Sequence, residues 1–352
     1  MNSTEVKEYY EFLKNNPRCH FLQSLEWGKI KNNWKNEVLC VRDDNGKIEG
    51  SMSILIQKIP VINRSILYCP RGPVCDITNK DVLNRLTNEV RSLAKREKAF
   101  IFRWDPDIPN SNEEFKKLAV ECGFNLKSDI NHDINKVIQP KYEMVLNIKD
   151  KTEDELLASF SQKTRYNIRL SMKKGVTFEE GSSEDINEFF DILTTTSQRD
   201  QFLIRDVSYY KKVYDIMKEN GHAKLYFAVF DGKRIASTLE IIYGNKAWYL
   251  YGASLREHSN VMPNYLLQWE MIKYAKQNGC EYYNLGGASG YIDENAPGYG
   301  VFRFKKGFNP DFVEYIDELD IVFKPFTNML FNVANRLRRF IRRIKKRELW
   351  EK

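Results

Sequence analysis

Strand-like and helix-like segments alternate along this chain, and the alternation occurs twice in its 352 residues. Runs rich in β-branched and aromatic residues and bounded by turn residues predict strands, whereas apolar residues spaced three and four positions apart predict helices. An alternation of this kind favours a mixed α/β fold over an all-α or an all-β fold. Because one domain takes roughly 150 residues, the length predicts about two domains.

The expected elements fall into two sets, separated by the polar run 150–153. The first set has strands at 38–41, 48–56, 99–104 and 142–148, with an amphipathic helix at 82–98. The second set has strands at 224–230, 235–243, 247–251 and 281–285, with a long helix at 263–277. We therefore predict a first domain at 1–148, a second domain at 149–322 and a separate C-terminal helix at 323–352.

The cysteines and histidines do not form a pattern typical of a metal site. Six cysteines are scattered without a Cys-x-x-Cys pair, and none of the four histidines lies at metal-ligand spacing from a cysteine. We expect reduced, mostly buried thiols, no metal and no dissociable cofactor. The N-terminus lacks the apolar segment of a secretion signal, and no run of about 18 apolar residues occurs, so we expect a cytoplasmic protein.

Several short blocks follow one another in a definite order. They are Trp27-Gly28-Lys29-Ile30-Lys31, Pro70-Arg71-Gly72-Pro73-Val74, Arg103-Trp104-Asp105-Pro106, Pro263-Asn264-Tyr265-Leu266-Leu267-Gln268-Trp269-Glu270, Tyr283-Asn284-Leu285-Gly286-Gly287 and the segment 298–308. Together, over roughly residues 20–325, they resemble the Fem family of peptidoglycan bridge-forming aminoacyltransferases. The resemblance implies two acetyltransferase-like (GNAT) domains, with the active site mainly in the second. No heptad-rich insertion lies between Lys174 and Lys224, so the chain is similar to compact members without a coiled-coil arm.

The same resemblance implies a reaction and its two substrates. An amino acid would pass from an aminoacyl-tRNA to the side-chain amine of the third residue of a peptidoglycan pentapeptide precursor. The precursor could be linked to a lipid or to a nucleotide, and the transferred amino acid stays open. No Ser/His/Asp arrangement or cysteine nucleophile stands out in the sequence, which favours direct transfer over a covalent acyl-enzyme.

Lys305 is the candidate for the central catalytic group. Attack of an amine on an aminoacyl ester passes through an intermediate with an oxyanion, so a positioned cation lowers the barrier. The resemblance places a catalytic Phe-Lys pair at Phe304 and Lys305: the Phe304 carbonyl would orient the amine and Lys305 would stabilise the oxyanion. We expect an extended segment here, in which Lys305 and Lys306 face opposite sides. The alternative is a solvated basic strand end.

Further site residues come from the resemblance. Asp105, at the end of a predicted strand, would contact the acceptor, although it could equally cap the turn before Pro106. Cations and hydroxyl groups should bind the pyrophosphate of the acceptor, and the candidates are Lys31, Arg205, Tyr209 and, less directly, Tyr265. Arg205 and Tyr209 are four residues apart where a helix is expected to begin, which places them on one face.

Plainer interpretations of these residues stay open. Lys31 could be an ordinary surface lysine, Arg205 could pair with Asp206, and both tyrosines could be core residues. Arg71, inside Pro-Arg-Gly-Pro, is equally compatible with a structural role.

Two other functions compete with aminoacyl transfer. An acetyl-CoA-dependent transferase is possible because the GNAT fold is shared and a fold does not determine a function. Such enzymes hold the pyrophosphate of acetyl-CoA at a glycine-rich turn that begins a helix. The segment between the predicted strand at 247–251 and Pro263 contains no Gly-x-Gly, which argues against acetyl-CoA. A noncatalytic tRNA-binding module that adheres to membranes is the third possibility.

The positive charge of the chain is concentrated in its last 17 residues. Arg336 to Lys352 contain nine Lys and Arg against two Glu, which accounts for the whole formal net charge of +7. Apolar residues in this region recur at intervals of four and three, which lines them along one side of a helix. They are Phe326, Leu330, Val333, Leu337, Phe340 and Ile344.

An apolar stripe flanked by cations is typical of a helix lying on an anionic membrane, where each basic residue contributes about 1 kcal/mol. Two alternatives are contact with the tRNA backbone, driven by counterion release, and a helix packed on the body of the protein with a solvated basic face. Phosphate contacts alone would not require the stripe, so we favour the membrane.

Overall fold

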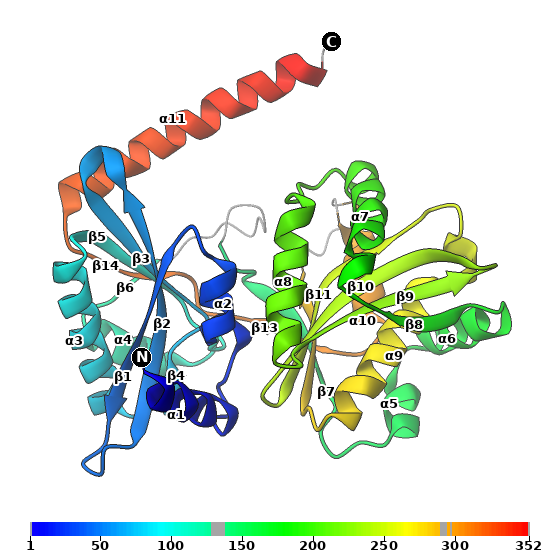
Figure 1. Ribbon diagram of the computed structural model, residues 1–352, viewed down its shortest axis with the longest axis horizontal. Coiled ribbons are helices and arrows are strands. Elements are labelled where there is room, and N and C mark those ends of the chain that lie inside the picture. Colours follow the sequence, from blue (N-terminus) through cyan, green and yellow to red (C-terminus); the bar gives the residue numbers. More distant parts are fainter. Residues whose placement is uncertain (1, 128–137, 289–293, 296–297, 351–352) are drawn as a thin grey trace. The chain divides into compact units, whose positions relative to one another are not determined.

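The computed structural model describes residues 2–127, 138–288, 294–295 and 298–350, with side chains up to residue 338 in the last range. Two compact units divide the chain, and neither is continuous in sequence (Figure 1). Unit 1 comprises Met1–Ile30, Asp107–Ser111 and Asp129–Ile316, and unit 2 comprises Lys31–Pro106, Asn112–Ser128 and Asp317–Lys352.

Unit 2 is built on one mixed sheet with the strand order β1-β2-β3-β5-β14-β6, and β4 pairs with β2 at one side. Only β3 and β5 run parallel among these pairs, and helix α3 connects them. The strands are β1 (Lys35–Arg42), β2 (Ile48–Ile59), β3 (Arg64–Pro70), β4 (Val74–Cys75), β5 (Ala99–Asp105), β6 (Asn125–Leu126) and β14 (Leu319–Val322), and the helices are α3 (Lys80–Arg96), α4 (Glu113–Glu121), α11 (Pro325–Trp350) and the short 3-10 helix η2 (Pro60–Ile62).

Helix α3 shows why this unit folds as its sequence predicts. Asn79 caps the helix, because its side chain accepts a hydrogen bond from the Val82 amide at 3.2 Å. Basic residues occupy the last turn, where they complement the helix dipole. Buried residues recur at intervals of three and four, so one face of α3 packs against β1, β2 and β5; they are Val82, Leu83, Leu86, Val90 and Leu93.

Unit 1 contains the second sheet, with the strand order β13-β7-β12-β11-β10-β9-β8. Within it β11 and β12 run parallel, and the other neighbouring pairs run antiparallel. Its strands are β7 (Tyr142–Asn147), β8 (Thr177–Gly181), β9 (Ala223–Phe230), β10 (Lys233–Tyr243), β11 (Lys246–Ser254), β12 (Tyr282–Gly287) and β13 (Asp311–Glu314).

Helices cover both faces of the unit 1 sheet. Tyr226 and Ala228 of β9 belong to a core that also contains residues of α5, α6 and α9. Leu225 and Phe227 alternate with them along the strand and therefore face the opposite side, where α7 and α8 pack (Figure 1). The helices are α1 (Ser3–Lys14), α2 (Leu25–Ile30), α5 (Glu153–Ser159), α6 (Gln162–Lys173), α7 (Ile186–Asp200), α8 (Val207–Glu219), α9 (Pro263–Gln277) and α10 (Tyr299–Lys306), with the 3-10 helices η1 (Phe21–Gln23), η3 (Ser183–Asp185) and η4 (Ser259–Val261).

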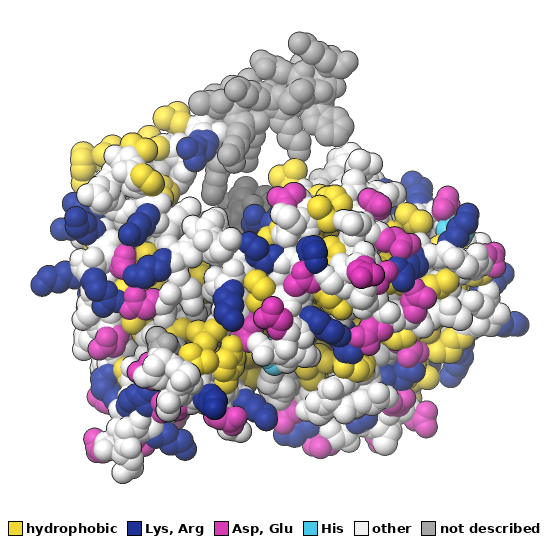
Figure 2. Space-filling model, viewed as in Figure 1, with side chains coloured by type: hydrophobic (Ala, Val, Ile, Leu, Met, Phe, Trp, Pro, Cys, Tyr) yellow, Lys and Arg dark blue, Asp and Glu magenta, His cyan; other side chains and the backbone are white. Residues whose placement is uncertain are grey.

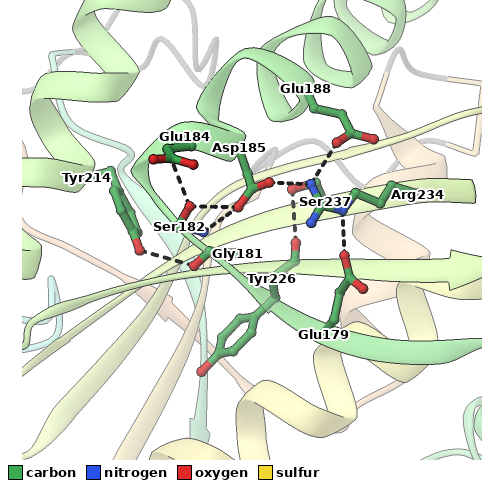
Figure 3. A network of polar contacts seen from close by, with 10 residues as sticks. All are labelled: Glu179, Gly181, Ser182, Glu184, Asp185, Glu188, Tyr214, Tyr226, Arg234 and Ser237. Atoms are coloured by element: carbon green, nitrogen blue, oxygen red, sulfur yellow. Dashed lines mark hydrogen bonds and ion pairs between the residues drawn. The ribbon is translucent and has the colours of Figure 1, made fainter.

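A cluster of ion pairs connects the β8 edge of this sheet to its neighbours (Figure 3). The Arg234 guanidinium of β10 donates to the carboxylates of Glu179 at 2.5 Å, Asp185 at 2.6 Å and Glu188 at 2.7 Å. It also lies over the Phe227 ring at 4.2 Å. One side chain thereby joins β8, β10 and the start of α7.

The predicted domain limits 1–148, 149–322 and 323–352 do not coincide with the two units. The segment before Lys31 belongs with residues 129–316 in unit 1, and β14, expected in the second domain, completes the sheet of unit 2. Strand β7, expected to close the first domain, pairs instead with β12 and β13. Hydrogen-bond pairing between distant segments therefore decides the division, and sequence spacing does not reveal such pairing.

Within the described ranges, no helix has both the length and the apolar character needed to cross a membrane. The same ranges hold no cluster of three or more His, Cys, Asp or Glu side chains arranged to hold a metal. All six cysteines carry free thiols, and five of them are buried.

Candidate active site

Lys305 lies in α10, near the end of this short helix, and not on the extended segment that we expected. The helix begins after Gly298, whose φ of 90° places it in the left-handed region that favours glycine. In a helix, residues three apart share a face, so Phe302 and Lys305 lie on one side of α10. Both are buried, as is Phe308 just after the helix. Only 7% of the Lys305 surface is exposed, whereas Lys306 is exposed. The two lysines do face different sides, but helical rather than extended geometry separates them.

The Lys305 ammonium is held in a defined position. Its Nζ donates a hydrogen bond to the Gly287 carbonyl at 2.7 Å and lies 6.0 Å from the centre of the Tyr249 ring. Burial lowers the pKa of Lys305 to about 8, and the negative charge of Glu143 opposes this shift. At neutral pH the amine therefore stays mainly charged, with N–H groups left to donate elsewhere.

The turn that receives Lys305 is fixed by a chain of buried polar groups. Asn284 accepts a hydrogen bond from the Gly286 amide at 2.7 Å and donates another to the Glu143 carboxylate at 2.5 Å. Gly286 has a φ of 81°, and a Cβ there would lie 3.3 Å from the Tyr249 carbonyl oxygen and 3.6 Å from Lys305 Nζ. A side chain at this position would be strained and would press against the Tyr249 carbonyl oxygen.

A pocket of ≈ 480 Å³ opens beside Lys305, entirely within unit 1. The parallel pairing of β11 with β12 covers residues 246–248 and 282–284, and the pocket is lined by the residues that follow on both strands. Such carboxyl ends of parallel strands are common ligand sites. Thr196 and Arg199 of α7 form another wall, and both donate hydrogen bonds to the Ser254 carbonyl, at 3.2 and 2.9 Å.

Phe304 also lines this pocket, and its ring packs against Tyr265 at 5.0 Å and Phe308 at 5.4 Å. Its carbonyl accepts a hydrogen bond from the Gly307 amide at 3.2 Å, which leaves a second lone pair for another donor. Tyr265 is half-buried, and its ring stacks in the aromatic group with Phe304 and Phe308. Its neighbour Asn264 lines the pocket.

Arg205 and Tyr209 lie close together, as their spacing predicts. The guanidinium is exposed and sits 4.9 Å from the centre of the Tyr209 ring. Arg205 precedes the first turn of α8 and is not within the helix, and the Asp206 carboxylate accepts a hydrogen bond from the Ser208 hydroxyl. Tyr210 continues this aromatic group to Tyr251, at 5.0 Å between ring centres.

Two tyrosines that we did not single out from the sequence, Tyr249 and Tyr251, line the pocket. A β-bulge between them shifts the register, so Tyr249 lies opposite Glu240 and packs against the core with α9, whereas Tyr251 lies opposite Leu239 and packs against Tyr210 of α8. Regular strand alternation would have placed both on one face, so the sequence contains no signal for this arrangement. Burial raises the pKa of Tyr249 to about 12, so its phenol stays protonated and can donate a hydrogen bond.

Asp105, Arg71 and Lys31 belong to unit 2 and not to the unit that contains Lys305. The Asp105 carboxylate accepts a hydrogen bond from the Tyr68 hydroxyl at 2.7 Å, and burial raises its pKa to about 6. Arg71 is buried, and its amide donates to the Asp105 carbonyl at 2.7 Å, which fits a structural role. Lys31 is half-buried directly after α2, and its carbonyl accepts from the Trp34 amide at 2.8 Å.

The profile of the FemAB family matches residues 4–234 and 228–336, which is nearly the whole chain. The chain belongs to the FemAB family. A relative from Staphylococcus epidermidis, named lipid II:glycine glycyltransferase, is 30% identical over 96% of this chain and 96% of its own length. A relative of the same name from Staphylococcus aureus is 29% identical, over 94% and 95%.

Solved structures agree with this membership of the FemAB family. The crystal structure of FemX superimposes with a TM-score of 0.87 and 27% sequence identity, covering 92% of this chain and 98% of that one. A tandem GNAT protein from the clavulanic acid biosynthesis pathway superimposes with a TM-score of 0.53 at 13% identity. The second likeness concerns the fold alone and agrees with the expected GNAT-like architecture.

Proposed function

We propose that this FemAB-family chain transfers an amino acid from an aminoacyl-tRNA to the side-chain amine of the third residue of a peptidoglycan pentapeptide precursor. The observation that carries the proposal is the buried Lys305 ammonium, which is anchored on the Gly287 carbonyl at the edge of the pocket. A cation that is fixed before the reaction starts stabilises a developing oxyanion without reorganisation.

The reaction has two steps at one carbon atom. The acceptor amine attacks the carbonyl carbon of the aminoacyl ester, which forms the new C–N bond and places negative charge on the carbonyl oxygen. Lys305 donates a hydrogen bond to that oxygen. The intermediate then collapses with cleavage of the ester C–O bond, and the proton lost by the amine ends on the ribose hydroxyl of the tRNA.

The remaining site residues take roles in holding the acceptor. In this proposal the Phe304 carbonyl uses its second lone pair to orient the attacking amine, and Asp105 contacts the acceptor peptide. Arg205 and Tyr209, which already lie against each other, and Lys31 would bind the acceptor phosphates. Tyr265 is the weakest candidate, because its ring packs in the aromatic group around Phe304.

The names of the staphylococcal relatives favour a lipid-linked acceptor and make glycine the first amino acid to test. The main alternative donor is acetyl-CoA. The loop between β11 and α9 argues against it, because α9 begins with Pro263 after Met262, without a glycine-rich turn that would present amide groups to a pyrophosphate.

The deciding experiment is a reconstitution with defined donors. The purified protein is incubated with a soluble nucleotide-linked pentapeptide precursor and either a panel of charged tRNAs or acetyl-CoA. The masses of the products are then measured by mass spectrometry. The proposal expects a mass increase of one amino-acid residue at the third position of the peptide, with charged tRNA alone. An acetyl adduct, or no adduct with any charged tRNA on a soluble or lipid-linked precursor, would contradict it.

A further inference from the structure

One end of unit 2 carries two exposed apolar segments. Strand β2 ends there, β3 and β5 begin there, and β14 ends there before α11 starts. The 3-10 helix η2 forms the tip of the β2–β3 hairpin, and α11 leaves the sheet at the same end. A small core of Ile66, Phe100 and Ile101 joins them, because Ile59 beside η2 and Phe331 of α11 both pack against it. Figure 1 shows the hairpin tip beside the first turns of α11.

Helix α11 is attached through one side and leaves an apolar stripe uncovered on the other. The Phe331 ring lies 5.2 Å from that of Phe100 on β5. At about 100° per residue, the residues of the stripe lie on the side of the helix away from Phe331. Five apolar residues here are about half exposed or more, and they are Phe326, Met329, Leu330, Val333 and Leu337. Within unit 2, these five described residues of α11 therefore do not pack against the sheet.

The tip of the hairpin has the same character. Val61 is 95% exposed and Ile62 is 41% exposed. Both belong to η2, so the tip presents apolar side chains to the solvent. A groove of ≈ 450 Å³ beside them is lined by Lys58, Arg64 and Lys98, among others. Figure 2 shows hydrophobic side chains gathered at this end of unit 2, with Lys and Arg side chains beside them.

The sequence adds positive charge where the helix continues. The match to the FemAB family ends at residue 336, and the segment from Arg336 onward contains the nine Lys and Arg that give the chain its net charge. This basic segment therefore lies almost wholly beyond the residues matched to the FemAB family. Its helical backbone continues to Trp350.

We propose that this end of unit 2 is a docking face for an anionic lipid surface. The α11 stripe inserts among the lipid headgroups, the η2 tip makes a second contact, and the cations around both pair with lipid phosphates. Apolar side chains flanked by cations suit such an interface, because burial of the apolar part and attraction to anionic headgroups act together. A tRNA backbone would use the cations but would leave Val61 and the stripe in water.

The proposal of a docking face is based on the exposure and charge of these residues, and it does not depend on the proposed function. If the docking face and the proposed function are both correct, docking holds the enzyme at the membrane surface, where a lipid-linked acceptor lies.

Sedimentation with vesicles tests the proposal directly. The probes are vesicles of phosphatidylcholine alone and of phosphatidylcholine with about 30% phosphatidylglycerol. We expect the full-length protein to bind the anionic vesicles, and binding to weaken when NaCl rises from about 0.1 M to about 0.5 M. The double variant Leu330→Glu/Val333→Glu should lose about tenfold or more in partitioning, and Val61→Asp should lose a smaller amount.

The matched control is Val120→Glu, which places the same charge at another half-exposed apolar position of unit 2, on α4. It should bind vesicles as the wild type does. Circular dichroism and thermal unfolding verify that each variant is folded.

Several outcomes would overturn the docking face. The first is equal binding of the wild type to neutral and anionic vesicles. The second is wild-type vesicle binding by both the stripe variant and the tip variant. The third is that these variants lose tRNA binding but keep vesicle binding. Dimerisation that the double variant abolishes would assign the face to a second copy of the chain. Activity on the soluble precursor is measured in parallel: its absence in the wild type counts against the proposed function, and its persistence in the stripe variants separates docking from chemistry.

Discussion

Lys305 and Lys306 are neighbours in the sequence and differ in burial, which makes them a matched pair of variants. If the Lys305 ammonium stabilises the oxyanion, Lys305→Ala should lower kcat by about a hundredfold or more, the range seen when one oxyanion donor is removed. Single-turnover assays with charged tRNA and soluble precursor measure this loss, and donor affinity should change much less. Lys306→Ala should stay near the wild-type rate, and an equal loss from both variants would refute the assignment.

The ionisation of Lys305 should also appear in the pH dependence of the rate. Its folded-state pKa is lowered to about 8 by burial, so the catalytically useful charged form is lost as the pH rises through about 8. Glu143 opposes this shift, and Glu143→Gln keeps the shape and the acceptor for Asn284 but removes the charge. The pKa of Lys305 should then fall further, and the descending limb of the pH–rate profile should move to lower pH.

Glu270→Gln, which removes a carboxylate paired with Lys273 on α9, is the control and should leave that limb in place. An alkaline limb that does not move in Glu143→Gln would show that another group controls it.

The sequence pointed to Lys305 but not to the groups that hold it. Glu143 and Asn284 are 141 residues apart, and only the pairing of β7 with β12 brings them together. A single sequence contains no signal for such a pair. Tyr249 and Tyr251 are a different case: alternation would place them on one face, but a β-bulge turns them to opposite faces, and a single sequence does not reveal that bulge.

At the scale of the elements, most strands and long helices were predictable because their hydrophobic periods are regular. The strands expected at 224–230 and 235–243 correspond to β9 and β10, and the helix at 263–277 corresponds to α9. The prediction of an extended segment around Lys305 was wrong, because this segment is a helix. It is only eight residues long and mixes aromatic with basic residues, so no window was long enough to separate a helical from an alternating period.

The Arg234 cluster gives a prediction on the stability of one edge (Figure 3). Three carboxylates converge on a guanidinium whose side chain is 22% exposed, and removing it leaves them to repel one another. Arg234→Ala should therefore lower the free energy of unfolding by about 1.5–3 kcal/mol, the range for hydrogen bonds to charged groups. Denaturant titration measures the change, and it should shrink at high salt.

Arg169→Ala, at an exposed position of α6, is the matched control and should shift unfolding by less than about 0.5 kcal/mol. The same loss in both variants would mean that the cluster adds nothing beyond an ordinary surface arginine.

At the scale of the whole molecule, length and alternation predicted two α/β domains, but not how the chain divides between them. The chain passes between the units five times, and two of its segments illustrate the difficulty. Strand β14, near the end of the sequence, completes the sheet of unit 2, and the first 30 residues belong to unit 1. A short strand such as β14, four residues long, pairs through backbone groups that every residue carries, so its partner cannot be deduced from its side chains.

The phosphate-binding role proposed for Lys31 and Arg205 gives the last prediction. Their contacts are remote from the reacting bond and should bind the ground state and the transition state alike. Lys31→Ala and Arg205→Ala should each raise the apparent KM for the acceptor by about tenfold, with kcat nearly unchanged. Steady-state kinetics with a nucleotide-linked precursor measure both constants. The control acceptor is the pentapeptide without phosphates, for which the two variants should equal the wild type. If the KM ratio between variant and wild type is the same for both acceptors, neither residue binds phosphate; if kcat falls instead, the residue acts in the chemical step.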